Sequence, residues 1–193
     1  SATSRVQVKP VSTDPLDPTS DAEVVDIATE QDLVKSDAVA DAVRAELDLP
    51  IDNRTLLRKV AVTSKEDSLV LEITYESANA QEAQDGANAF ADAYLAQRQA
   101  DAERAVQSRL ETIREQIAFT RVALDDARAS GDQAAVQEFQ TQLNTLNASY
   151  TTIDAVNTAD VGRVVRRVTS PPEAVLSKMA LGKAVGIVGL CLL

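Results

Sequence analysis

The sequence contains no histidine and no tryptophan, and it has only one cysteine, three phenylalanines and three tyrosines. Histidine is the most frequent general base and metal ligand, so its absence argues against a catalytic or metal centre. The single Cys191 excludes an intramolecular disulfide. So few aromatic rings also leave little flat apolar surface for a deep sugar-binding pocket. We therefore expect no enzyme activity, no cofactor and no metal.

Positive charge is scarce as well. Lysine and arginine number 19 against 30 aspartates and glutamates, which gives a formal net charge of -11. This charge repels phosphate backbones, and no basic stripe interleaved with aromatics offsets it, so we expect no nucleic-acid partner. The 193 residues are 45% hydrophobic and 25% charged, which is enough for one globular domain with its own core.

Long apolar runs are missing until residues 179–193, where Lys183 is the only charge. A bilayer span needs about 20 such residues, so we interpret this run as a truncated transmembrane helix, with a buried helix or hydrophobic tail as the alternative. Gly182 and Gly186 form a GxxxG spacing, which is a weak signal by itself. The predicted membrane-span residues are Met179, Leu181, Val185, Ile187, Val188, Leu190, Leu192 and Leu193.

The region 1–79 changes its periodicity twice. Apolar and polar residues alternate over 4–10, which predicts a half-buried strand. A helical period then follows over about 20–49. Two alternating segments, 56–64 and 68–76, are joined by a polar triplet and predict a β-hairpin.

A long proline-free segment, rich in good helix formers, predicts a helix from Ala80 to about Ala129. Gly131 interrupts it, and a second helical segment with the same alternating three-four spacing follows. The two segments predict an antiparallel helical hairpin of about 70 Å. Its predicted apolar seam comprises Val106, Leu110, Ile113, Ile117, Leu124, Val136, Phe139, Leu143, Leu146 and Tyr150, with Thr120, Ala127 and Ile153 at the same spacing.

A last alternating segment over 161–169 predicts a fourth strand. The order strand, helix, strand, strand, helix pair, strand predicts an α+β protein, a ferredoxin-like split βαβ sheet domain with an extended coiled-coil hairpin, followed by the truncated transmembrane helix. We expect a membrane-proximal α/β part, the projecting hairpin, a closing strand, a proline-containing linker and the membrane segment. Their predicted bounds are 1–79, 80–160, 161–170, 171–178 and 179–193.

Several segments of the chain carry a family resemblance. Residues 29–39 (TEQDLVKSDAV) and the following 43–49 resemble the paired helices of Wzz-type polysaccharide co-polymerases, the chain-length determinants. The stretch 73–76 (ITYE), followed by 87–95 (ANAFADAYL), is similar to the entry into that family's long helix. The prolines of 170–172 resemble the family's proline segment before the second membrane helix, although the spacing is compressed.

The resemblance implies a non-enzymatic, membrane-anchored regulator of surface polysaccharide (capsule, exopolysaccharide or O-antigen) chain length and export. It implies two membrane helices with both ends cytoplasmic, and this domain on the extracytoplasmic side, either periplasmic or extracellular. The implied partners are the membrane, a polysaccharide polymerase, the nascent glycan and further copies of the chain in a ring-like homo-oligomer, for which an octamer is one stoichiometry.

Two other classes of function stay open. Some relatives carry or partner a cytoplasmic tyrosine kinase, so the domain could be an extracellular sensor or activator of a bacterial tyrosine kinase. Alternatively, it could belong to an enzyme whose catalytic domain lies elsewhere. A phosphate-binding loop needs a serine or threonine after the Gly-Lys pair, and Ala184 follows Gly182-Lys183. These residues therefore contain no kinase.

Three arginines, Arg163, Arg166 and Arg167, precede the proline segment. They could contact anionic lipid headgroups or the growing glycan. Alternatively, they form a solvated strand face that pairs with Asp154 and Asp160.

Overall fold

A computed structural model describes residues 1–10, 25–65, 68–155 and 162–168 of the chain. In chain order the elements are β1 (Ala2–Val8), α1 (Ile27–Val34), α2 (Asp37–Glu46), α3 (Asn53–Leu57), β2 (Val60–Ser64), β3 (Val70–Tyr75), α4 (Ala80–Ser130), α5 (Gln133–Asp154) and β4 (Gly162–Arg166). The mixture of helices with one antiparallel sheet confirms the predicted α+β class.

The four strands lie in the order β2-β3-β1-β4, and every neighbouring pair is antiparallel. Val6 of β1 is opposite Leu71 of β3 on one side and Val164 of β4 on the other. The first and last strands of the chain are therefore neighbours within the sheet.

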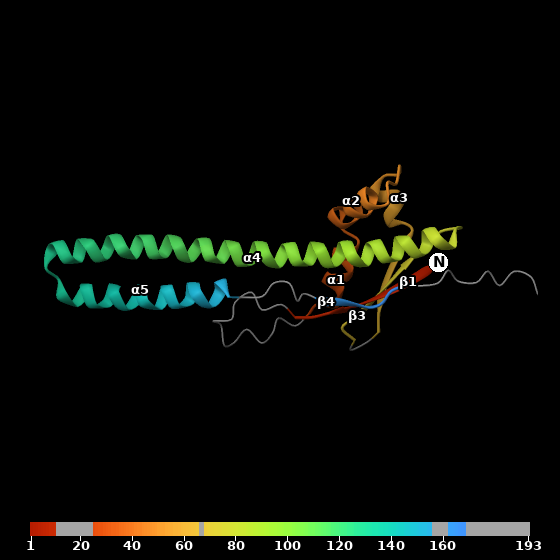
Figure 1. The fold of residues 1–193 in the computed structure, drawn as a ribbon. Coiled ribbons are helices and arrows are strands. Elements are labelled where there is room, and N and C mark those ends of the chain that lie inside the picture. The colour runs from red at the N-terminus through yellow and green to blue at the C-terminus, as the bar shows by residue number, and fades with distance from the viewer. Residues whose placement is uncertain (11–24, 66–67, 156–161, 169–193) are drawn as a thin grey trace, which may run out of the picture.

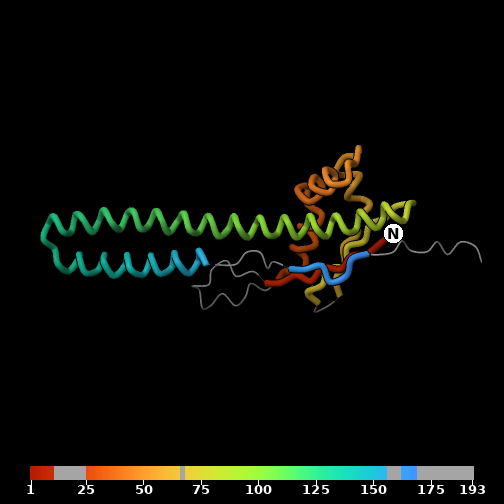
Figure 2. The backbone as a smooth tube through the Cα atoms, in the orientation of Figure 1, coloured from red at the N-terminus to blue at the C-terminus, as the bar shows by residue number. Residues whose placement is uncertain are grey.

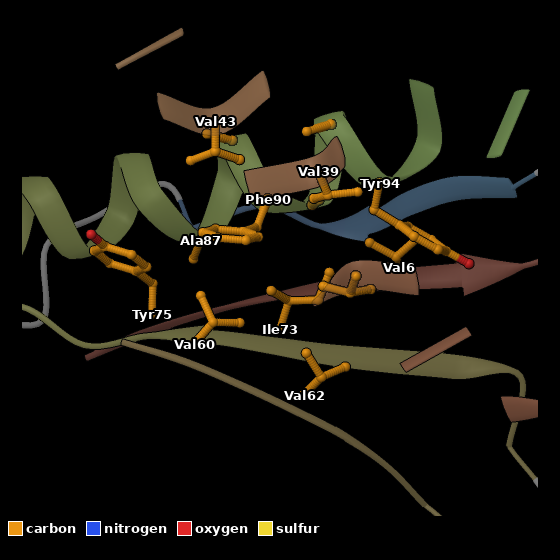
Figure 3. Packing of buried hydrophobic residues seen from close by; sticks show 14 of the residues in the cluster. Val6, Val39, Val43, Val60, Val62, Ile73, Tyr75, Ala87, Phe90 and Tyr94 are labelled. Carbon is orange, nitrogen blue, oxygen red and sulfur yellow. The ribbon is translucent and has the colours of Figure 1, made fainter. Parts of the chain in front are cut away.

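One face of the sheet is buried against helices, as the alternating burial of β1 indicates. Figure 3 shows side chains from the strands pointing toward side chains from α2 and α4. The labelled members of this core are Val6, Val39, Val43, Val60, Val62, Ile73, Tyr75, Ala87, Phe90 and Tyr94. In the part of the chain that the structure describes, the helices lie on this one side and the opposite sheet face is open (Figure 1).

Helix α4 approaches the sheet closely because Gly86 has no side chain. A Cβ atom at Gly86 would lie 2.5 to 2.7 Å from three atoms of the Tyr75 ring, which is fully buried. The same ring packs against Phe90, with 6.1 Å between the ring centroids. Glycine thus sets the distance between the helix and the sheet.

Helix α4 is 51 residues long, or about 75 Å at ~1.5 Å per residue, and only its first part covers the sheet (Figure 2). Asn79 caps its start by accepting hydrogen bonds from the backbone N–H groups of Gln81 and Glu82. Gly131, in the left-handed region with φ 74°, ends it, and Asp132 caps α5. We call α4 from Ala102 onward, together with α5, the arm.

The structure refines the helical prediction over about 20–49 and corrects the strand prediction over 56–64. The described part of the helical segment contains two helices, because Ser36 is extended and its Oγ accepts a hydrogen bond from Val39 N–H to start α2. The strand over 56–64 begins only at Val60. The preceding residues form α3, which Asp52 caps through the backbone N–H of Thr55.

The predicted linker and transmembrane segment, 171–193, lie outside the described residues. Among the residues that the structure describes, no helix is both long and apolar enough to cross a membrane.

Candidate functional site

No group of three or more acidic or cysteine side chains lies close enough together, in the described ranges, to hold a metal ion. An open depression near the start of α4 is lined by Lys59, Glu76, Ser77 and Glu82. A hydrogen bond from Ser77 and the ion pair with Lys59, 3.3 Å away, hold the pKa of Glu82 below its usual value. This pairing ties the residue before β2 to the start of α4. We consider the arm and its base as the candidate site.

The predicted seam residues lie between the two helices of the arm. Val106, Leu110, Ile113, Ile117, Leu124 and Leu143 are buried, as is Ile153, and Val136, Phe139, Leu146 and Tyr150 pack partly buried against them. Thr120 is also buried, and its hydroxyl donates a hydrogen bond of 2.8 Å to the Gln116 carbonyl, which satisfies it. The seam therefore holds α5 along α4.

The outer surface of the arm carries two exposed apolar residues. Phe119 is 76% exposed and Val122 is 62% exposed. Because they are three residues apart in a helix, both lie on one side of α4, away from the seam. Closer to the base, Arg114 stacks over the Tyr150 ring, 5.1 Å from its centroid, and donates a hydrogen bond to its hydroxyl.

A buried ion pair marks the place where α4 leaves the sheet. Arg98 Nε donates to Glu30 Oε1 at 2.9 Å, and the side chains are only 11% and 12% exposed. Tyr94 Oη donates to the other Glu30 oxygen at 2.7 Å, and burial raises the pKa of the Tyr94 phenol. Arg98 Nη1 also donates to the Lys9 carbonyl at 2.8 Å. We call Glu30, Tyr94 and Arg98 the arm root.

The arm root connects α4 to α1 and to the end of β1, segments far apart in the sequence. Sequence reasoning missed it. The pairing of Glu30 with Arg98 spans 68 positions and follows no periodic pattern, so only the fold brings the two charges together.

A second polar cluster joins α4 to the strands at both ends of the chain. Asn88 Oδ1 accepts hydrogen bonds from Ser4 Oγ at 2.6 Å and from Val168 N at 3.2 Å, and its Nδ2 donates to the Val168 carbonyl. Asp92 accepts two hydrogen bonds from Arg167, at 2.5 and 2.6 Å. We call these five residues the exit clasp, because Arg167 and Val168 directly follow β4.

The three predicted contact arginines do not share one environment. Arg167 pairs with Asp92 of α4, not with Asp154 as suggested from the sequence, and Asp160 lies outside the described residues. Arg163 donates a hydrogen bond from Nε to Gln7 Oε1 at 3.1 Å. Arg166 is exposed on β4, opposite Arg5 of β1.

Comparisons with protein-family models, with curated proteins and with solved structures find no match for this chain.

Proposed function

We propose that this chain is a non-enzymatic regulator of surface polysaccharide chain length and export, of the Wzz type, which acts as a membrane-anchored homo-oligomer on the extracytoplasmic side of the cell membrane. The strand order β2-β3-β1-β4 supports this proposal, because it agrees with a ferredoxin-like split βαβ sheet whose second helix is extended into a hairpin. This is the architecture that the order of the predicted elements indicates, in a chain whose segments resemble the paired helices and the long-helix entry of that family.

The direction of the arm is the observation that carries the proposal. Because β1 and β4 are antiparallel neighbours, the start of β1 and the end of β4 lie at the same end of the sheet. The arm extends from the opposite end (Figure 1). A membrane anchor after Val168 would therefore leave the arm projecting away from the bilayer, by about 40 Å for the part of α4 from Ala102 to Ser130.

In this proposal the domain acts on polymer synthesis through the length and spacing of its arms. Arms held at a fixed height and spacing would bound the space between the polymerase at the membrane and the growing glycan. Chain length would then depend on the length and arrangement of the arms. The seam and the arm root supply the stiffness that such a spacer needs, because they fix α5 on α4 and α4 on the sheet.

A second function is favoured by the exit clasp. Asn88 and Asp92 lie on the same helix as the arm and hold Arg167 and Val168, which lead toward the apolar run at 179–193. A ligand that displaced the arm could shift that segment, as expected of an extracellular sensor or activator of a bacterial tyrosine kinase.

Deletion of the gene tests the main proposal against this second one. Loss of a length regulator should leave surface polysaccharide present with a changed length distribution on gels. Loss of a kinase activator should instead lower tyrosine phosphorylation, with polymer length following the kinase. Glycosyl transfer by the purified protein alone would contradict both proposals.

A further inference from the structure

The open face of the sheet carries an excess of positive charge. Arg5 alternates with buried residues of β1, exposed Arg163 alternates with half-buried residues of β4, and a β-bulge brings Arg166 opposite Arg5. Glu72 of β3 pairs with Arg5 at 2.9 Å. Three guanidinium groups against one carboxylate leave a net charge of +2 on a chain whose net charge is -11. We call Arg5, Glu72, Arg163 and Arg166 the basic face.

In a single copy of the chain, the positive charges of the basic face are not fully balanced. Arg5 and Arg166 lie directly across the strand pair from each other, where like charges destabilise a sheet, and the single carboxylate of Glu72 offsets only one of the two charges. The bulge also leaves Val165 53% exposed beside them. The face therefore suits a partner that offers carboxylates together with small apolar groups.

The outer side of α2 has this complementary chemistry. Its exposed residues are Asp37, Ala38, Asp41, Ala42, Ala45 and Glu46. At 100° per residue, the three alanines form a ridge with carboxylates along both of its sides. Arg44, the one basic residue of the helix, donates to Asn53 at 3.1 Å and pairs with Asp41 at 3.5 Å, so it offsets one of the three carboxylates and leaves the outer side negative. We call the six exposed residues the acidic face.

The two faces lie on opposite sides of the sheet domain, with α2 above α4 and the open sheet face below (Figure 1). A contact between the basic face of one copy and the acidic face of the next would repeat roughly at right angles to the arm. If successive copies also keep the same rotation about this contact, every copy points its arm in the same direction, which anchoring in one membrane requires. Contacts between different faces of identical subunits close into a ring when the rotation from one copy to the next closes, and otherwise build an open filament.

We propose that the basic face of one copy of this chain packs against the acidic face of the next, and that this head-to-tail contact builds the ring. The inference rests on the homo-oligomer of the proposed function and deepens it by naming the surfaces that meet. We take a second copy of this chain as the partner, because the chain itself carries both the basic face and the complementary acidic face. The alanine ridge allows the flat sheet to approach, and Val165 adds apolar contact.

The test compares oligomer mass of the full-length protein in mild detergent. Arg163→Glu/Arg166→Glu reverses the charge of the basic face, and Asp41→Lys/Glu46→Lys reverses the charge of the acidic face without touching a helix cap. Each double variant should shift the protein from oligomer to monomer, whereas all four changes in one chain should restore the oligomer. Arg104→Glu/Arg128→Glu, two exposed arm positions outside both faces, is the matched control and should keep it. Circular dichroism checks that each variant is folded.

The outcomes separate this inference from the proposed function. A wild-type protein that is monomeric at all workable concentrations would contradict the homo-oligomer itself. A wild-type oligomer that both folded double variants retain would overturn the interface and leave the proposed function standing. Retained mass together with lost binding to phosphatidylglycerol vesicles in Arg163→Glu/Arg166→Glu would also overturn it, because the basic face would then contact lipid.

Discussion

Gly86 is the residue at which α4 comes closest to the sheet. Gly86→Ala would place a methyl group within 2.5 Å of the Tyr75 ring, which is enclosed by the core and cannot move aside. We expect the free energy of unfolding to fall by about 1 to 3 kcal/mol, as is usual for overpacking. Chemical denaturation measures this change. If the contact were absent, alanine would instead stabilise the helix by about 1 kcal/mol, and a more stable variant would contradict the packing.

The arm root allows a second prediction at the residue scale. Arg98→Met keeps the length of the side chain but leaves the Glu30 carboxylate, 12% exposed, without its cation. Breaking a buried ion pair in this way lowers the free energy of unfolding by about 3 to 5 kcal/mol. Thermal and denaturant unfolding would show the loss.

Arg104→Met is the matched control for this prediction, because Arg104 forms an ion pair with Asp101 on the exposed surface. It should change stability by no more than about 1 kcal/mol. Equal effects of the two substitutions would mean that the arm root does not hold α4 in place.

Residue-scale contacts were the least predictable from the sequence. Three arginines before the proline segment signalled a cluster, but the fold sends Arg167 to Asp92 and leaves Arg166 across from Arg5. Neighbouring residues of an extended chain point to opposite sides, and the bulge in β4 shifts this alternation so that Arg166 lies opposite Arg5. The five residues of β4 carry no sequence pattern that predicts the bulge. Long-range partners depend on strand register, which the sequence alone specifies only through its apolar alternation.

At the scale of elements, local sequence patterns predicted the structure correctly where a helical pattern continues over many residues. The proline-free, alanine-rich segment and the Gly131 interruption predicted the long helix and its return, and α4 ends within one residue of the expected Ala129. The prediction was less accurate for short elements, because there a capping side chain decides where a helix starts. Ser36 starts a second helix inside the predicted helical segment, and Asp52, between two predicted segments, starts a short helix that reaches into the predicted strand.

The seam can be tested as an element. Ile113→Asp or Leu146→Asp places a charge between α4 and α5, and either should lower the free energy of unfolding of the arm by roughly 2 to 5 kcal/mol. Asp126→Ala, on the exposed side of α4, should do little. Circular dichroism melting curves decide. Two seam variants with wild-type helicity and melting temperature would show that the helices do not depend on this contact.

At the scale of the whole molecule, the order of elements predicted the α+β class, and the structure adds what the order could not. It places the start of β1 and the end of β4 at one end of the sheet and the arm at the other (Figure 2). It also places opposite charges on the two broad sides of the domain. Both features come from packing between segments distant in the sequence, so neither has a local signature.

Arm length is the quantity on which the proposed function depends. Deleting 118–124 from α4 together with 137–143 from α5 removes one heptad from each helix and keeps the turn at Gly131. The arm then shortens by about 10 Å, and Ala127 and Leu146 take over vacated seam positions. Duplicating the same two segments lengthens the arm by the same amount. Protein level in the membrane and helicity confirm that both variants fold.

Gel profiles of surface polysaccharide from cells carrying these two variants test the central claim most directly. The account predicts that the modal glycan length shifts in opposite directions when the arm is shortened and when it is lengthened, with total polymer retained. An unchanged length distribution in both folded variants would contradict a length-setting role for the arm.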